Sequence, residues 1–263
     1  MLLSPFMMLA RHWDVFARTT VSEIRSRYAG SVLGLIWMLI APLLLMAIYA
    51  TVYLFIFRVR PVEMSSWQYV IYVLSGLLPF LGFSEALSAG SMSLTLNRAI
   101  LLSTVFPAEL VPLRAVVSAQ APSLIGLFLC IALAAVLGNA SVSMLAIPFI
   151  WLALLMFVSG IVLALSLVSL LVRDVQQALG FVNMVLLIAS PIAYTPSMVP
   201  ERVRGLLAIN PLSHFIDAMH ETIVFGRTPS WRATVVMAVL ALGSFSVGFW
   251  LFQRVKRVLF DYA

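Results

Sequence analysis

Long apolar runs separated by short polar segments dominate the chain. The first clear run, Gly34–Phe57, contains no charged residue. A later one, Ala115–Val172, extends over 58 residues without an Asp, Glu, Lys, Arg or His. A membrane-spanning helix needs about 20 apolar residues, so this second run is too long for a single crossing. Its one cluster of turn-forming residues, Gly138–Ser141, predicts where it breaks into two helices.

Across the whole chain this pattern predicts six membrane-spanning helices, at about 34–57, 67–89, 115–137, 144–172, 178–194 and 233–253. If the N-terminus is inside, the inner segments carry ten Arg or Lys residues and the outer segments six. Cytoplasmic loops are usually the more basic ones, so we expect both termini in the cytoplasm. Composition agrees with a multi-pass membrane protein, because 10% of the residues are charged, against about 25% in soluble domains.

The segment before the first predicted span has the periodicity of an amphipathic helix. From Arg11 to Tyr28, one face of such a helix would carry Trp13, Phe16, Thr20, Val21, Ile24 and Tyr28. We expect this helix to lie in the membrane surface, as part of an N-terminal interfacial segment 1–33 that precedes the transmembrane domain 34–263. Gly30 and Gly34 would let the backbone turn from the flat helix to the upright one.

The segment between the fifth and sixth predicted spans, Ser190–Gly226, is half apolar and contains four prolines. It is too interrupted to cross the bilayer, so we expect a re-entrant helical hairpin in the outer leaflet. Asn210-Pro211 predicts a helix start, with Asn as the cap and Pro in the first turn. Asp174, followed three residues later by Gln177, predicts a capping box at the start of the fifth span.

Motifs for nucleotide or metal chemistry are incomplete in this sequence. A Walker phosphate loop requires a Gly-Lys pair, and the one lysine of the chain lies elsewhere, in RVKRV (254–258). His220-Glu221 begins an H-E-x-x-H pattern, but Val224 stands where the second histidine belongs. A metal site formed by His214, Asp217 and Glu221 on one helical face is a weaker alternative to an ordinary polar surface.

A few polar or small residues stand out inside the apolar runs. Glu85 is the one acidic residue well inside a predicted span, which makes it a functional candidate. The alternative is that it reaches water or pairs with an arginine such as Arg98. Ser159-Gly160 predicts a close approach of two helices. Cys130 is the one cysteine and is expected to be a packed core residue.

The boundary between the interfacial segment and the first span reads RSRYAGSVLGLIWMLIAPLL over 25–44. SGLLPF (75–80), NRAILLSTVFPAELVPL (97–113), RD (173–174), SPIAY (190–194) and NPL (210–212) follow in order. This ordered set resembles the membrane subunits of ABC-2 type polysaccharide exporters, the permeases for O-antigen, teichoic acid or capsule.

The resemblance implies an all-α integral membrane protein with the ABC-2 exporter fold, working as a homodimer. Two copies of a separate ATPase subunit would use ATP and Mg²⁺, so the chain itself would be no enzyme and would hold no cofactor. The cargo would be a polysaccharide on polyprenyl diphosphate, moved to the outer side of the bacterial inner membrane. No nucleic-acid partner is expected, although the net charge is +6, because the cations lie at the edges of apolar runs. An ABC-2 exporter of drugs or small lipids and an intramembrane polyprenyl-lipid transferase remain as alternatives.

Three groups of residues are candidates for these tasks. Arg25, Arg27 and Tyr28 are candidates for binding the diphosphate, because guanidinium forks suit phosphate; anchoring of the topology is the alternative. The candidates for lining the conduit, where aromatic rings would pack on sugar rings, are Trp37, Tyr49, Tyr53, Phe181 and Tyr194. The alternative is that these rings face lipid or other helices. The candidates for coupling to the ATPase are Asn97, Arg98, Phe106, Pro107 and Glu109, with Arg173 and Asp174 as secondary choices.

Overall fold

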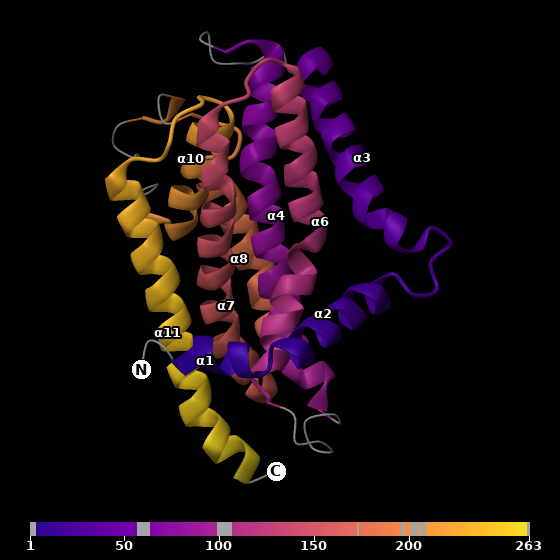
Figure 1. Cartoon of the computed structure of the whole chain (residues 1–263), viewed down its shortest axis with the longest axis vertical. Coiled ribbons are helices and arrows are strands. Elements are labelled where there is room, and N and C mark those ends of the chain that lie inside the picture. Colours follow the sequence, from indigo (N-terminus) through magenta and orange to yellow (C-terminus); the bar gives the residue numbers. More distant parts are fainter. Residues whose placement is uncertain are drawn as a thin grey trace.

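The computed structural model of the chain describes residues 4–56, 64–98, 107–172, 174–195, 198–200, 205 and 209–261. Within these ranges every regular element is a helix (Figure 1). The long helices of the bundle are α4 (Ser66–Leu96), α6 (Leu110–Val136), α7 (Ile147–Leu171) and α11 (Trp231–Asp261). Helix α4 forms the centre, packed between α6 and α7, and α11 packs on the far side of α7.

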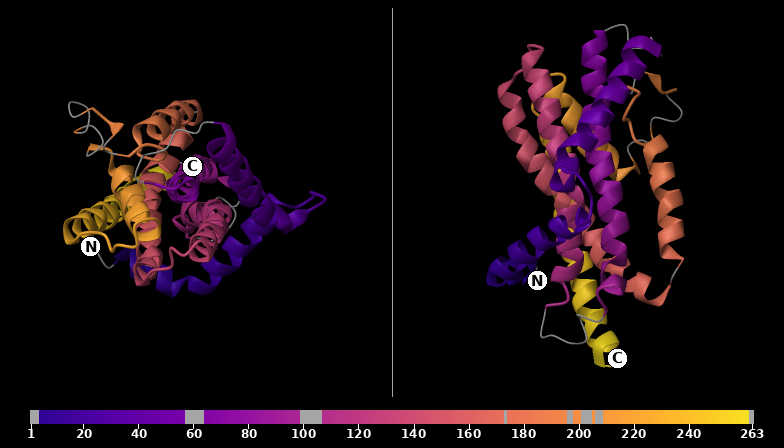
Figure 2. Two further views of the ribbon diagram at one scale, coloured as in Figure 1. Left: turned by 90° about the horizontal axis from the view of Figure 1, so that it is seen from above. Right: turned by 90° about the vertical axis from the view of Figure 1, so that its right-hand side faces the viewer.

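The shorter helices surround this bundle. At the end where both termini lie, α1 (Ser4–Arg11) and α2 (Trp13–Arg27) run across the side of the long helices. Helix α3 (Trp37–Thr51) follows the 3₁₀ turn η1 (Gly34–Ile36) and continues into the π turn η2 (Val52–Ile56). It packs along α6. Helix α8 (Val175–Ala189) stands on the outside of the bundle, as Figure 2 shows, and α10 (Pro211–Ile223) packs against the end opposite the termini.

Five helical segments are long and apolar enough to cross a membrane, namely Gly34–Thr51, Ser66–Leu96, Leu110–Val136, Val142–Leu171 and Trp231–Lys256. They coincide with the first four predicted spans and the last one. The remaining predicted span, 178–194, falls on α8, which has 15 residues. At 1.5 Å per residue α8 is about 22 Å long, shorter than a hydrocarbon core of about 30 Å. The sixth crossing therefore stays a prediction.

Helix α8 ends earlier than predicted because of a proline. Pro191 disfavours the helical conformation at the residue before it, and Ser190 accordingly has φ −95° and ψ 141°. Tyr194, which the sequence pattern included in the span, lies beyond this end.

The predicted turns at glycines are confirmed. Gly138, after the end of α6, has φ +86°, and Gly30 and Gly34, between α2 and α3, have φ +82° and +54°. Residues with a Cβ atom rarely adopt this left-handed region. The chain therefore turns at the positions where glycine permits it.

One of the two predicted helix caps is confirmed and the other is wrong. Asn210 has an extended backbone and accepts a hydrogen bond from the Leu212 amide at 3.0 Å, with Pro211 as the first helical residue. Asp174 precedes α8, but its side chain accepts no capping hydrogen bond. Its φ of −77° and ψ of −6° are near-helical, whereas a capping residue is usually extended.

The predicted close approach at Ser159-Gly160 is confirmed. A Cβ atom at Gly160 would overlap the backbone of Ser244 on α11, and one at Gly248 would overlap the carbonyl of Gly160. The Ser244 hydroxyl donates a hydrogen bond to the Phe157 carbonyl at 2.8 Å. Helices α7 and α11 therefore touch backbone to backbone.

A helix lies where the amphipathic helix was predicted, but only part of its apolar face is covered. Phe16 and Thr20 of α2 are buried, and α2 packs against α6. Trp13 and Val21, which share that predicted face, are 58% and 48% exposed. A membrane-surface position for α2 stays a prediction.

Candidate functional site: a polar cavity between α2, α4 and α6

A cavity of about 600 Å³ lies near the termini, where α2 crosses α4 and α6. We call it the α2–α4–α6 cavity. It is lined by Thr19, Ser22, Glu23, Ser26 and Arg27 of α2, by Glu85, Ala89, Ser93, Leu96 and Asn97 of α4 and its cap, and by Arg114 of α6. Charged and hydroxyl side chains from three helices thus meet in one place.

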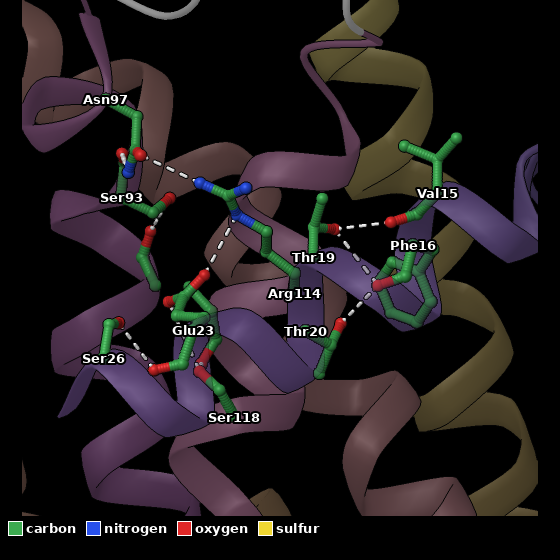
Figure 3. A network of polar contacts seen from close by, with 12 residues as sticks. Val15, Phe16, Thr19, Thr20, Glu23, Ser26, Ser93, Asn97, Arg114 and Ser118 are labelled. Carbon is green, nitrogen blue, oxygen red and sulfur yellow. Dashed lines mark hydrogen bonds and ion pairs between the residues drawn. The ribbon is translucent and has the colours of Figure 1, made fainter. Parts of the chain in front are cut away.

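One wall of the cavity is a network centred on Arg114 (Figure 3). The Arg114 Nε atom lies 2.9 Å from Glu23 Oε2, and Arg114 Nη2 donates to Asn97 Oδ1 at 2.8 Å. The Ser118 hydroxyl donates to the other Glu23 oxygen at 3.3 Å. The side chain of Arg114 is 13% exposed, so this ion pair is mostly shielded from water. The network ties α2 to the start of α6 and the end of α4.

The second ion pair joins Arg27 to Glu85, with 3.1 Å between Nη1 and Oε1. Glu85 therefore has an arginine partner, but this partner is Arg27 and not Arg98. Arg98 lies 13 residues further along, about 20 Å along the helix axis. The pair holds the last turn of α2 against α4.

The structure does not bring Arg25 and Arg27 to one point. Arg25 lines a separate groove of about 390 Å³ with Ala17, Arg18, Val21 and Ser22. Residues two apart in a helix lie on nearly opposite faces, which explains the divergence. Tyr28 is half-buried, and burial raises the pKa of its phenol, while Arg27 lowers that pKa and Glu85 raises it. The Tyr28 hydroxyl therefore stays protonated and is able to donate a hydrogen bond.

Glu109 is 3% exposed and faces the interior of the protein. Its Oε1 atom accepts hydrogen bonds from Gln253 Nε2 and from Lys256 Nζ, the latter at 2.9 Å. Both donors belong to α11. An effect of Glu109 on a partner subunit would therefore be transmitted through α11 and not by direct contact of its carboxylate.

The other residues predicted to couple to an ATPase are dispersed around the same end. Asn97 belongs to the Arg114 network, and Pro107 is half-buried before α6. Arg98 and Asp174 are exposed. Phe106 and Arg173 lie outside the described residues.

Aromatic rings form a row at the end opposite the termini. Tyr49 and Tyr53 stack with ring centroids 6.1 Å apart, and Tyr53 meets Tyr69 edge to face at 5.1 Å. Tyr69 stacks on Tyr72 at 6.3 Å, and Tyr72 stacks on His220 of α10 at 3.8 Å. These five residues, the aromatic row, connect α3, α4 and α10.

The other three predicted conduit residues relate differently to this row. The main-chain carbonyl of Tyr194 accepts a hydrogen bond from the Tyr72 hydroxyl at 3.1 Å. Trp37, at the start of α3, and Phe181, on α8, are 37% and 73% exposed and take no part in the row.

Sequence reasoning missed three of the five residues of the aromatic row and most of the Arg114 network. The spacing of Tyr69 and Tyr72 within one predicted span would have placed both on one helical face. Nothing local links Glu23 to Arg114, which are 91 positions apart in the sequence. Among the described residues, no group of three His, Cys, Asp or Glu side chains is arranged to hold a metal ion, including at His214, Asp217 and Glu221.

Comparison with known proteins agrees with the predicted resemblance. An O-antigen export system permease protein RfbA of Klebsiella pneumoniae is 30% identical over 217 residues, covering 81% of this chain and 82% of the relative. A second protein of that name from the same species is 26% identical over 247 residues, 93% of each chain. One from Myxococcus xanthus is 26% identical over 227 residues, 84% of each chain. Residues 15–224 match the family described as ABC-2 type transporter, and the chain therefore belongs to this family.

Proposed function

We propose that this protein is the channel-forming membrane subunit of an ATP-driven exporter of polysaccharide. Its cargo is a glycan linked to polyprenyl diphosphate, moved from the cytoplasmic to the outer side of the bacterial inner membrane. The observation that carries this proposal is the likeness to O-antigen export permeases over at least 81% of the chain. Five helices capable of crossing a membrane support the role of a multi-pass subunit.

The exporter consists of two copies of this chain and two copies of a separate ATPase subunit. This sequence has one lysine, Lys256, which follows no glycine-rich loop, so ATP and Mg²⁺ bind to the partner. The ATPase docks at the end of the bundle that carries α2 and the connection between α4 and α6. Movement there reaches α2 and α11 through the ion pairs of Arg114 and Glu109.

The glycolipid enters at the corner between α2 and α3. Arg27 and Tyr28 bind the diphosphate once the Arg27 guanidinium has released Glu85, because a guanidinium binds phosphate and carboxylate with the same fork of donors. Arg25, on the opposite face of α2, contacts lipid headgroups. The aromatic row near the other end offers flat apolar faces to sugar rings.

A deletion strain tests this function. Loss of the chain should cause lipid-linked glycan to accumulate on the cytoplasmic side, and expression of the chain together with its ATPase should restore export. An ATPase variant that binds ATP but does not hydrolyse it serves as the control, and it should not restore export. Normal glycan export in the deletion strain, combined with new sensitivity to drugs, would instead support a drug exporter of the same superfamily.

A further inference from the structure

Three of the four hydroxyl side chains that line the α2–α4–α6 cavity, all but that of Ser22, donate a hydrogen bond within their own helix. Thr19 Oγ1 donates to the Val15 carbonyl at 2.7 Å, Ser26 Oγ donates to the Glu23 carbonyl at 2.8 Å, and Ser93 Oγ donates to the Gly90 carbonyl at 2.7 Å. A hydroxyl has one proton to donate and two lone pairs that accept. Because these three side chains donate their protons within their own helices, they are left to accept hydrogen bonds from a ligand.

The charges of the cavity cancel. Arg27 is paired with Glu85, and Arg114 is paired with Glu23 and Asn97. A diphosphate that links a polyprenol to a sugar offers only acceptor oxygens, and it reaches a guanidinium here only where a carboxylate gives way, as proposed for Glu85 at Arg27. The part of the cavity away from Arg27, where Arg114 keeps its Glu23 partner, therefore favours a neutral group with many O–H donors over an anion.

We infer that the α2–α4–α6 cavity binds the sugar rings of the cargo that lie next to the diphosphate. This inference rests on the proposed function and adds a saccharide site to it. The volume of about 600 Å³ lies within the range of about 300–1,000 Å³ that is typical of small-molecule sites. Arg27 lines the cavity at the last turn of α2. A glycolipid held there by its diphosphate places its first sugar among the acceptors of Thr19, Ser26 and Ser93.

The test compares two lipids that differ in one sugar. The probes are geranylgeranyl diphosphate and the same lipid carrying a single glucose, bound to the complete transporter, permease with ATPase, in nanodiscs. The ratio of their dissociation constants isolates the contribution of the sugar, because the isoprenyl chain and the phosphates are shared. We expect the glucose-bearing lipid to bind more tightly to the unaltered transporter.

Two substitutions remove acceptors from the cavity at little cost to the fold. Thr19→Val and Ser93→Ala each delete a hydroxyl that bonds only within its own helix. A hydrogen bond between neutral groups contributes about two- to tenfold in affinity, so each variant should shrink the affinity gain from glucose by that factor. Thr51→Val is the matched control, because Thr51 also donates to the carbonyl four residues earlier, at 2.8 Å, but lies on α3 away from the cavity.

The outcomes separate the inference from the proposed function. If glucose adds no affinity in the unaltered transporter, or adds the same affinity in Thr19→Val and Ser93→Ala as in Thr51→Val, the inference is wrong and the proposed function stands. If the cavity variants weaken both lipids equally, the cavity binds the diphosphate or the lipid, and the inference is again wrong. If neither lipid binds the unaltered transporter, the proposed function itself fails.

Discussion

Replacing Gly248 with alanine should weaken the contact between α7 and α11. The added Cβ atom would overlap the carbonyl of Gly160. Helix backbone cannot rotate away from a clash as the end of a side chain can, so α11 has to move as a unit. Such a movement also stretches the hydrogen bond of 2.8 Å from the Ser244 hydroxyl to the Phe157 carbonyl.

The size of the effect follows from three contributions to the free energy of unfolding. Overpacking costs about 1–3 kcal/mol, and the upper half of this range applies because every overlapped atom belongs to the backbone. Loss of the Ser244 hydrogen bond adds about 1 kcal/mol. Alanine recovers about 1 kcal/mol over glycine through its helix propensity. The net loss is about 2–3 kcal/mol, which lowers Tm by about 5–10 °C in a chain of this size.

The measurement is thermal unfolding of the purified chain in detergent, with Gly243→Ala as the matched control. Gly243 lies on the same helix, and a Cβ atom there meets nothing within 4 Å. The control should melt at the temperature of the unaltered chain or slightly above it. Equal melting temperatures for Gly248→Ala and Gly243→Ala would show that the two helices are not in backbone contact.

Three further predictions concern the two ion pairs and α10. Lys256→Met leaves the Glu109 carboxylate, whose side chain is 4% exposed, with the Gln253 amide but without Lys256, at a cost of about 3 kcal/mol, the low end of the range for breaking a buried ion pair. Glu109→Gln should cost less, because Lys256 is 32% exposed and reaches water. Amide hydrogen exchange in the last turns of α11 distinguishes the two, and equal protection would contradict this asymmetry. Arg114→Gln breaks the link between α2 and α6, so the reconstituted transporter should keep ATP hydrolysis but lose export, and tight coupling in this variant would exclude a transmitting role for the pair. Burial, reinforced by Glu221, raises the pKa of Asp217 from 3.8 to about 7. The folded state therefore binds the proton more tightly, and stability should fall between pH 4 and pH 7. Asp217→Asn should abolish this dependence and raise Tm at pH 8, and a pH-independent Tm in the unaltered chain would contradict the shift.

The features of the fold that depend on local sequence could be predicted. Hydrophobic length located five of the helices. Gly138 marked a turn because it has no Cβ atom, and Asn210 marked a cap because its own side chain accepts the capping hydrogen bond. The capping prediction for Asp174 was wrong because capping requires an extended backbone at the cap, and the surrounding chain sets that conformation. Pro191 predicts that α8 ends before Tyr194, because proline disfavours the helical conformation at the residue before it. A hydropathy pattern does not take this effect into account.

The candidate site was predictable only in part, because its contacts are long-range. Helical periodicity alone would have separated Arg25 from Arg27. The pairing of Glu23 with Arg114, and of Glu109 with Lys256, depends on how α2 and α11 cross α6, and no local pattern encodes these crossings. The aromatic row likewise needs α3, α4 and α10 in their places before its rings meet.

The most direct test is reconstitution of this chain with its ATPase in vesicles that carry polyprenyl-diphosphate-linked glycan in the leaflet that the ATPase faces. A glycan-specific lectin added on the opposite side reports the cargo that arrives there. We expect transport when both subunits and ATP are present, and none when the ATPase, the ATP or this chain is left out. Transport by this chain without ATP hydrolysis, or no transport of the glycolipid by the complete and hydrolysing complex, would contradict the proposed function.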